Sequence, residues 1–348
     1  MTVDDLPAAT GHGRKILVTG GAGFIGSHLV DHLLTSPGTD ELRVLDNFAT
    51  GRKENLAAAM GDGRMHLIEG DIRDHATVSA ACAGADVVFH LACLGVRHSL
   101  HRPEENHDVN ATGTLRLIEA ARHRAVRRFI HVSTSEVFGT AQSAPMDEAH
   151  PTWPETVYGG SKLAGEAYAR AAFRTHGFPA VIVRPFNNYG SRSHFEHDSG
   201  EIIPRSVVRL LAGRPPLIFG DGCQTRDFLH VSDCVRALVD LAACEAAVGE
   251  TVNVGYGREC SIADLCRLIA DLAGRADLQP KHLEARPGDV RRLWVDNRKV
   301  RELIGFKPRV TLEEGLRELI EWFSSGAFEL EEMMSQVVDR NWVESGAS

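Results

Sequence analysis

The feature that most constrains the fold of this chain is a glycine-rich loop between a short apolar run and a helical pattern. The run at 15–19 is predicted to be a buried strand, and a helix is predicted from Phe24 to Leu34. The loop between them, from Gly20 to Gly26, fits both G-x-G-x-x-G and G-x-x-G-x-x-G. Glycines here allow a tight turn and a close approach to a pyrophosphate, which the amides of a helix N-terminus bind. A strand, this loop and a helix in that order predict a dinucleotide-binding site.

An acidic residue at the end of the next predicted strand indicates which dinucleotide binds. Asp46 follows the run at 42–45 and lies about twenty residues after the loop, where a carboxylate accepts a hydrogen bond from a ribose 2′-hydroxyl. The same carboxylate would repel a 2′-phosphate, so we expect NAD rather than NADP. Arg52 and Lys53 lie nearby, and we interpret them as a solvated basic turn. Asp71, after the following strand, is expected to meet the adenine edge.

Short β-rich runs alternate with helical stretches along the first half of the chain. Further strands are predicted at 65–68, 87–90, 128–133 and 180–183. This alternation predicts right-handed βαβ units in a doubly wound, mostly parallel sheet with helices on both faces, which is a Rossmann-type α/β fold. The runs at 227–231 and 251–254 are predicted to return to the same sheet.

The pattern changes after Pro185, where the stretch 187–222 becomes rich in Gly, Pro, His and charge. We interpret this stretch as part of a substrate-facing lobe rather than another βα unit. A helix from near Ser261, a strand near Leu283 and a helix at 312–323 would complete a smaller α/β lobe interleaved with the first. The expected division is a disordered leader 1–13, an NAD-binding domain 14–186 with 228–262, a substrate domain 187–227 with 263–325, and an acidic tail 326–348, in which 329–342 could form a helix.

Charge and composition exclude several classes of function. The formal net charge of −9 argues against a nucleic-acid-binding protein. No apolar run reaches the roughly 18–20 residues of a membrane span, and the first thirteen residues lack the pattern of a secretory signal, so we expect a cytoplasmic protein. The seven cysteines show no Cys-x-x-Cys pair and are expected to be reduced, with Cys93 at a strand end near the cofactor. His194, His197 and Asp198 are interpreted as polar loop residues, so no metal site is predicted.

Tyr158 and Lys162 are the candidate catalytic pair. They are four residues apart, which places both side chains on one face of a helix. A nearby ammonium lowers the pKa of a phenol from about 10 and makes it a proton acceptor during hydride transfer. The pair follows the triplet Thr134, Ser135 and Glu136. The spacing of two residues alone is weak evidence, and this order makes the catalytic interpretation specific.

In combination these motifs resemble the extended short-chain dehydrogenases/reductases, in particular their NAD-dependent nucleotide-sugar epimerases, dehydratases and decarboxylases. The resemblance extends from about residue 15 to 323. Its motifs are TGGAGFIG at 19–26, LDN at 45–47, GDIRD at 70–74, HLA at 90–92, NATGT at 110–114, STSEVFG at 133–139, YGGSK at 158–162, RPFNNYG at 184–190, RDFLHV at 226–231 and RPGDV at 286–290.

The resemblance implies roles for individual residues. Thr134 matches the hydroxyl that bonds the sugar O4, Tyr158 the base that takes the O4 proton, and Lys162 the anchor of the nicotinamide ribose. The cofactor residues implied are Gly20, Gly23, Phe24, Ile25, Gly26, Asp46, Asn47, Asp71, Ile72, Leu91, Ala92, Asn110, Ser133, Tyr158, Lys162 and Pro185. The substrate residues implied are Val96, Arg97, Asn187, Arg226, Arg286 and Asp289, although Arg226 could instead pair with Asp227 and Arg286 could be a surface charge. Family members are commonly homodimers, so we expect a homodimer.

The net reaction stays open at this point. The leading hypothesis is a UDP-sugar 4-epimerase, because Ser135 replaces the aspartic acid with which dTDP-glucose 4,6-dehydratases protonate the departing hydroxyl. Glu136 matches the C5 base of GDP-mannose dehydratases and also occurs in UDP-glucuronate decarboxylases, so a dehydratase or decarboxylase is the alternative. Against decarboxylation, the carboxylate-facing arginine of those enzymes falls near Leu293, just after Arg291 and Arg292. Glu136 could also be structural, and a non-catalytic NAD-sensing module is the remote alternative.

Overall fold

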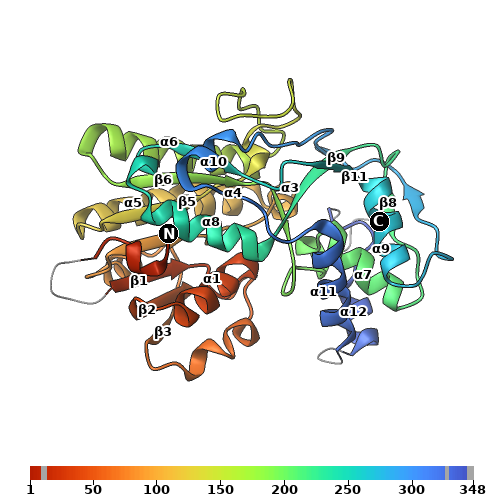
Figure 1. The fold of residues 1–348 in the computed structure, drawn as a ribbon, viewed down its shortest axis with the longest axis horizontal. Coiled ribbons are helices and arrows are strands. Elements are labelled where there is room, and N and C mark those ends of the chain that lie inside the picture. Colours follow the sequence, from red (N-terminus) through yellow and green to blue (C-terminus); the bar gives the residue numbers. More distant parts are fainter. Residues whose placement is uncertain (9–13, 326–328, 343–348) are drawn as a thin grey trace.

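The computed structural model describes residues 1–8, 14–325 and 329–342, and its centre is a seven-stranded sheet in which every neighbouring pair of strands is parallel. Helices cover both faces of the sheet, and a smaller lobe lies beside it (Figure 1). The predicted doubly wound Rossmann-type fold is confirmed. In sheet order the strands are Thr251–Val254 (β10), Ala180–Pro185 (β6), Arg128–Val132 (β5), Val87–His90 (β4), Arg14–Thr19 (β1), Thr39–Asp46 (β2) and Met65–Glu69 (β3).

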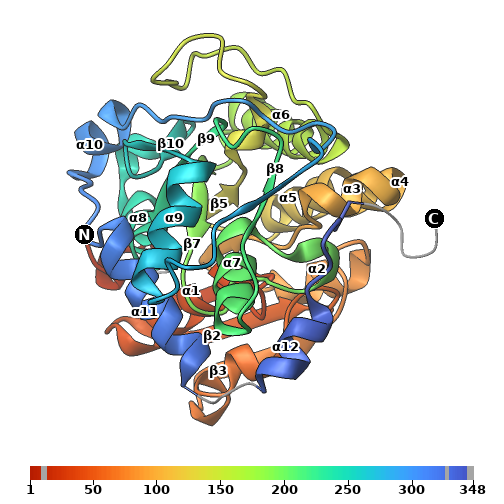
Figure 2. The ribbon, with the colours of Figure 1, turned by 90° about the vertical axis from the view of Figure 1, so that its right-hand side faces the viewer.

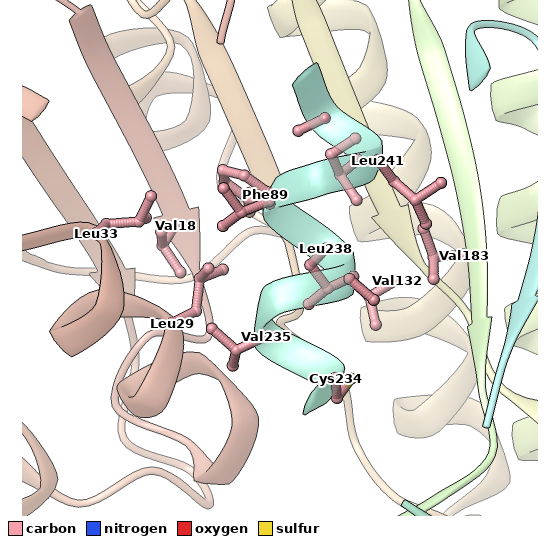
Figure 3. Close-up of a cluster of buried hydrophobic side chains, with 14 of the residues drawn as sticks. Val18, Leu29, Leu33, Phe89, Val132, Val183, Cys234, Val235, Leu238 and Leu241 are labelled. Carbon is pink, nitrogen blue, oxygen red and sulfur yellow. The ribbon is translucent and has the colours of Figure 1, made fainter. Parts of the chain in front are cut away.

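Apolar side chains on both faces of the sheet explain why these strands are central. On one face, helices α1 (Phe24–Thr35) and α8 (Val231–Ala243) bury Leu29 and Leu238 against Val18, Phe89 and other strand residues (Figure 3). On the other face, α2 (His75–Ala81), α5 (Thr114–His123) and α6 (Val157–His176) cover the alternate strand residues. Two short helices, α3 (Val96–His101) and α4 (Pro103–His107), and a π-helical segment, Asp108–Gly113, precede α5.

The smaller lobe contains two small sheets and its own apolar core. The expected return of 227–231 to the large sheet is wrong, because β9 pairs with β7 and β11 instead. β9 then leads directly into α8, and only β10 joins the large sheet, at its edge. The strands of this lobe are Asn187–Tyr189 (β7), Leu217–Phe219 (β8), Thr225–His230 (β9), Glu259–Ser261 (β11) and Lys281–Leu283 (β12), and its helices are Ile202–Leu211 (α7), Ile262–Leu272 (α9), Leu312–Ser324 (α11) and Leu330–Gln336 (α12), while Arg298–Ile304 (α10) packs near β10.

Helix α7 shows that the stretch 187–222 is more regular than its composition indicates. Its apolar residues Ile203, Val207 and Leu210 are buried and pack against α9 and α11. The spacing of these residues is helical, but the flanking glycines, prolines and charges hide it in the sequence. The interpretation of this stretch as part of the smaller lobe is compatible with the structure, and the functional division into two domains stays a prediction.

Both ends of the chain pack more closely than expected. Residues 3–5 form a short 3-10 helix, and Val3 and Leu6 are buried with the residues of α8, so the prediction of a disordered leader is wrong for residues 1–8. Residues 9–13 lie outside the described part. In the tail, α12 ends at Gln336 rather than Trp342, and Met333 is buried beside α7. Apolar side chains at these positions explain why short acidic segments adhere to the lobes.

Candidate active site

A cavity of about 830 Å³ lies at the carboxyl ends of the parallel strands, where residues of both lobes meet. This is the edge at which open α/β sheets bind ligands. Every predicted catalytic, cofactor and substrate residue lines the cavity except Asn110. Further residues line the cavity that the sequence did not predict, because none of them belongs to a recognisable local motif. They are Glu201, Arg205, Phe219, Gln224 and Gln336.

The glycine loop forms a cradle that suits a pyrophosphate. Gly20 has a φ of 71°, and a Cβ added to it would lie 2.6 Å from the Ala92 amide nitrogen. A Cβ on Gly26 would collide with the Gly20 carbonyl oxygen. No side chain caps the N-terminus of α1 and its first turn holds no acidic residue, so its amides remain available to an anion. The cradle therefore fits a dinucleotide.

Replacing Gly26 with alanine is expected to remove most of the bound NAD. The new methyl group must displace the Gly20 carbonyl, which distorts the backbone that faces the pyrophosphate. The measurement is the NAD released from the purified, heat-denatured protein per mole of chain. Gly63→Ala is the matched control, because a Cβ at Gly63 would have no heavy atom within 4 Å apart from those of Gly63 itself and its two chain neighbours. A G26A protein with the NAD content of the G63A protein would contradict this role of the loop.

Asp46 ends β2 and faces the cavity as predicted. Its two carboxylate oxygens accept hydrogen bonds from the Ala22 amide at 2.9 Å and the Phe48 amide at 2.8 Å. Burial raises the pKa of Asp46, and these amides act in the opposite direction. Each oxygen keeps a second lone pair, so the carboxylate can still accept a ribose hydroxyl.

The residues expected at the adenine end are held by side-chain pairing. Asn47 donates to Asp71 at 2.9 Å, and the Arg73 guanidinium lowers the pKa of Asp71 to about 2. Lys53 pairs with Glu69 at 3.0 Å. Arg52 keeps 37% of its side-chain surface exposed, and it also reaches the smaller lobe and pairs with Glu196 at 2.5 Å. Both basic side chains therefore have carboxylate partners among the described residues.

The catalytic candidates meet where β5 ends and α6 begins. Thr134 caps a short 3-10 turn by accepting a bond from the Glu136 amide, and Tyr158 lies in the first turn of α6. Lys162 is buried, and its ammonium donates to the Val132 carbonyl at 2.6 Å. The helix thus holds the phenol and the ammonium against one strand end, as their spacing predicts.

The sequence predicts that the Lys162 ammonium lowers the pKa of Tyr158. This direction is wrong for the protein without bound NAD. Burial raises the pKa of the Tyr158 phenol well above 10, the neighbouring Cys93 acts in the same direction, and a hydrogen bond with Thr134 lowers it. Burial also lowers the pKa of the Lys162 ammonium. Desolvation of the phenolate is the largest cause of the Tyr158 shift.

A buried ion pair that the sequence analysis missed supports this face of α6. Glu166 is fully buried and accepts from Arg184 Nε at 2.8 Å and Nη2 at 2.6 Å. It also accepts from the Ser133 hydroxyl at 2.6 Å, directly before the catalytic triplet. The only sequence signal is that Glu166 lies four residues after Lys162, on the same helix face. The pair ties α6 to the ends of β5 and β6.

The Asn110 side chain stabilises a neighbouring backbone segment and does not line the cavity. Its amide group accepts from the Leu94 amide at 2.9 Å and donates to the Leu94 carbonyl at 2.9 Å. It also donates to Asn106 at 3.0 Å. The structure thus places Asn110 outside the cavity lining, where its buried side chain fixes the backbone after Cys93, and the cofactor contact implied for it stays a prediction.

The substrate end of the cavity is rich in charge. Arg226 and Arg286 both donate to Asp289, at 2.9 Å and 2.5 Å. Arg226 does not pair with Asp227, whose carboxylate instead accepts from the amides of Tyr256 and Gly257. The alternatives of an Arg226–Asp227 pair and of Arg286 as a free surface charge are therefore not supported.

Glu136 lies among these arginines. Burial raises its pKa, and the nearby Arg226 and Arg286 act in the opposite direction. A carboxyl group with a raised pKa in a cavity is a candidate for proton transfer. Of the candidates near Leu293, Arg291 pairs with Asp221 and Arg292 with Glu259, both outside the cavity lining.

The described residues contain no group of three or more His, Cys, Asp or Glu side chains placed to hold a metal ion. His194, His197 and Asp198 line the cavity wall. None of the described helices is long and apolar enough to cross a membrane.

Comparison with known proteins decides the family. The family model described as GDP-mannose 4,6 dehydratase matches residues 17–319. The chain is 38% identical over 312 residues to a UDP-glucose 4-epimerase of Mycolicibacterium smegmatis, covering 89% of this chain and 98% of the relative. The chain belongs to the GDP-mannose 4,6-dehydratase-like family of extended short-chain dehydrogenases/reductases.

Members of this family share a cofactor and a substrate class but differ in net reaction. A dTDP-glucose 4,6-dehydratase of Actinoplanes sp. is 36% identical over 316 residues, which cover 89% of this chain and 97% of the relative. The crystal structure of DesIV, a dTDP-glucose 4,6-dehydratase from Streptomyces venezuelae with NAD bound, superposes with a TM-score of 0.85 at 33% identity, covering 90% of this chain and 97% of that one. The chain is thus an NAD-dependent enzyme of the nucleotide-sugar epimerase and dehydratase family.

Proposed function

We propose that this enzyme is a UDP-sugar 4-epimerase that oxidises its substrate transiently at C4 and returns hydrogen to the opposite face of the 4-keto sugar. The observation that carries the proposal is Ser135, which lies in the cavity wall between Thr134 and Glu136. A serine hydroxyl is a poor acid, so this position does not supply the proton that a departing hydroxyl needs. UDP is proposed as the nucleotide because a UDP-glucose 4-epimerase is among the relatives.

In this proposal, side chains of the protein accept the O4 proton and orient the O4 oxygen and the cofactor. Tyr158 is the proposed base for the O4 proton, and Thr134, which bonds the phenol, is placed to orient the same oxygen. Lys162, held by the Val132 carbonyl, is the proposed anchor of the nicotinamide ribose. NAD, when bound, supplies the hydride acceptor and a positive charge that favours the phenolate.

A lyase is the second candidate, because Glu136 is a cavity carboxyl whose pKa burial raises. Such a group could remove the C5 proton that a 4-keto group acidifies, which would lead to loss of water. Decarboxylation has less support, because neither Arg291 nor Arg292 lines the cavity and both have carboxylate partners.

Product mass distinguishes these reactions. The purified enzyme is incubated with UDP-, dTDP- and GDP-sugars, and the products are weighed and their C4 configuration is determined by NMR. We expect a UDP-sugar epimer of unchanged mass. A product lighter by one water or one CO2 would replace the epimerase with the lyase. Absence of turnover across the panel, with NAD still bound, would favour the non-catalytic NAD-sensing module.

Replacing Glu136 with glutamine is expected to leave epimerisation within about tenfold of wild type, since the amide keeps the shape but loses the base. The measurement is kcat and the product mass with the substrate that the panel identifies. Asp289→Asn is the comparison, because Asp289 accepts from both Arg226 and Arg286 and its loss should raise KM. A fall in E136Q turnover of about 10²–10⁴-fold would instead assign proton transfer to Glu136.

The homodimer and the cytoplasmic location stay predictions. Sedimentation of the purified enzyme tests the first, and fractionation of the producing cells tests the second.

A further inference from the structure

The C-terminal segment, defined here as Leu330–Trp342, lies beyond the family match, which ends at residue 319. It packs on the smaller lobe: α12 lies beside α7 in both ribbon views (Figures 1 and 2). Asn341 is buried and donates to the Gly200 carbonyl at 2.9 Å. The Trp342 ring meets Phe219 edge-on, with ring centroids 4.5 Å apart. The segment therefore packs against α7 and β8, the two elements that supply Arg205 and Phe219 to the cavity lining.

The segment also determines the place of one cavity arginine. Arg205, on α7, lines the cavity and is only 5% exposed. Its Nη2 donates to the carbonyls of Val338 at 2.6 Å and Asp339 at 3.1 Å. These bonds orient the guanidinium without neutralising it, because carbonyl oxygens carry no net charge. The carboxylate of Asp339 pairs with Arg209 instead, at 2.7 Å.

Arg205 lacks a charged partner in the part of the chain that the structure describes. None of the described carboxylates lies within ion-pair distance of it, and its buried Nε has no hydrogen-bond partner there. Arg97, on α3, lines the same cavity and likewise has a buried, unpartnered Nε. A buried guanidinium, that of Arg205, and a partly buried one, that of Arg97, are costly in one cavity unless an anion compensates them.

The two arginines act on each other electrostatically. Burial and Arg97 lower the pKa of Arg205 to about 9, and burial and Arg286 lower the pKa of Arg97 to about 10. Glu201 and Glu136 act on Arg97 in the opposite direction, but neither lies within ion-pair distance of it among the described residues. Arg97, Arg205 and Arg286 thus contribute positive charge to the same cavity, and of the three only Arg286 pairs with a carboxylate, Asp289, among the described residues.

We propose that Arg205, positioned by the C-terminal segment, binds an oxyanion of the substrate. The inference rests on the proposed function for the substrate class, a nucleotide sugar. The oxyanion is either the diphosphate, shared by every nucleotide sugar, or the carboxylate of an acidic sugar. A planar guanidinium forms paired, charge-assisted bonds with both groups.

The test compares Arg205→Gln with wild type by calorimetric titration of the NAD-loaded enzyme with UDP, UDP-glucose and UDP-glucuronate. We expect the Kd to rise by about ten- to a hundredfold, the loss typical of a hydrogen bond to a charged group. A rise for all three ligands assigns Arg205 to the diphosphate, and a rise for UDP-glucuronate alone assigns it to the sugar carboxylate. An unchanged Kd for all three overturns the inference and leaves the proposed function intact. A wild-type enzyme that binds none of them overturns both.

Arg209→Gln is the matched control. Arg209 lies one turn further along α7 and bonds to the same segment and to the Pro215 carbonyl, but it does not line the cavity. We expect its Kd values to stay within about twofold of wild type, since Asp339 is exposed. Arg205→Lys should recover part of the affinity. Equal losses in R205Q and R209Q would show that the arginine only attaches the segment, which would overturn the anion contact.

A second pair of variants tests the positioning role of the segment. Trp342→Ala removes the ring against Phe219, over which the Arg205 guanidinium lies at 5.9 Å. Arg340→Ala removes only an exposed pair with Glu284 at 3.7 Å. We expect W342A to raise KM by about three- to tenfold with kcat unchanged, as for lost uniform binding, and R340A to change neither. If W342A matches R340A, the segment does not position Arg205.

Discussion

Replacing Tyr158 with phenylalanine is expected to lower kcat by about 10²–10⁴-fold, the usual contribution of a positioned acid or base. The ring keeps its volume in the cavity wall, but the O4 proton loses its acceptor and Thr134 loses its hydrogen bond with the phenol. KM and the content of bound NAD should change little, because the phenol acts in the transition state rather than in binding. The measurement is steady-state kinetics on the substrate that the panel identifies, with NAD content measured on the same samples.

Tyr168→Phe is the control for this prediction. Tyr168 lies on the same helix, but it packs against the core cluster beneath the sheet rather than in the cavity. Its loss of a hydroxyl should leave kcat within about twofold of wild type. A Y158F enzyme that turned over as fast as Y168F would exclude the phenol as the proton acceptor.

Replacing Glu166 with glutamine is expected to destabilise the fold by about 3–5 kcal/mol, the cost of breaking a buried ion pair from one side. Glutamine removes the negative charge and leaves the Arg184 guanidinium, only 3% exposed, without a counter-charge. It also weakens the bond that holds the Ser133 hydroxyl. The measurement is denaturant unfolding followed by the tryptophan fluorescence of the purified protein.

Glu119→Gln is the matched control for E166Q. Glu119 also pairs with an arginine, Arg122 at 2.8 Å, but both side chains are partly exposed. The loss there should be about 0–1 kcal/mol, because water and salt screen such a pair. Similar unfolding midpoints for E166Q and E119Q would show that the Glu166 ion pair does not stabilise the fold.

Local motifs predicted the parts of the fold and site that short segments determine. The glycine loop, Asp46 at the end of β2, and the Tyr158–Lys162 spacing each depend on one strand, one turn or one helix. The structure brings their side chains into one cavity, because the carboxyl ends of parallel strands share an edge.

What the sequence could not predict depends on contacts between distant segments. β9 pairs with β7 and β11 because the chain changes lobes after β6, and no residue in 227–231 signals that change. The Glu166–Arg184 pair and the contacts of Arg205 with the C-terminal segment join residues far apart in sequence. The direction of the Tyr158 pKa also required the burial that only the assembled cavity shows.

Transient oxidation at C4 is tested most directly with a nucleotide sugar that carries deuterium on C4. We expect slower turnover than with the unlabelled sugar, and deuterium on the nicotinamide ring of coenzyme released from enzyme quenched during turnover. Equal rates for both sugars, with no deuterium ever found on the coenzyme, would contradict the account.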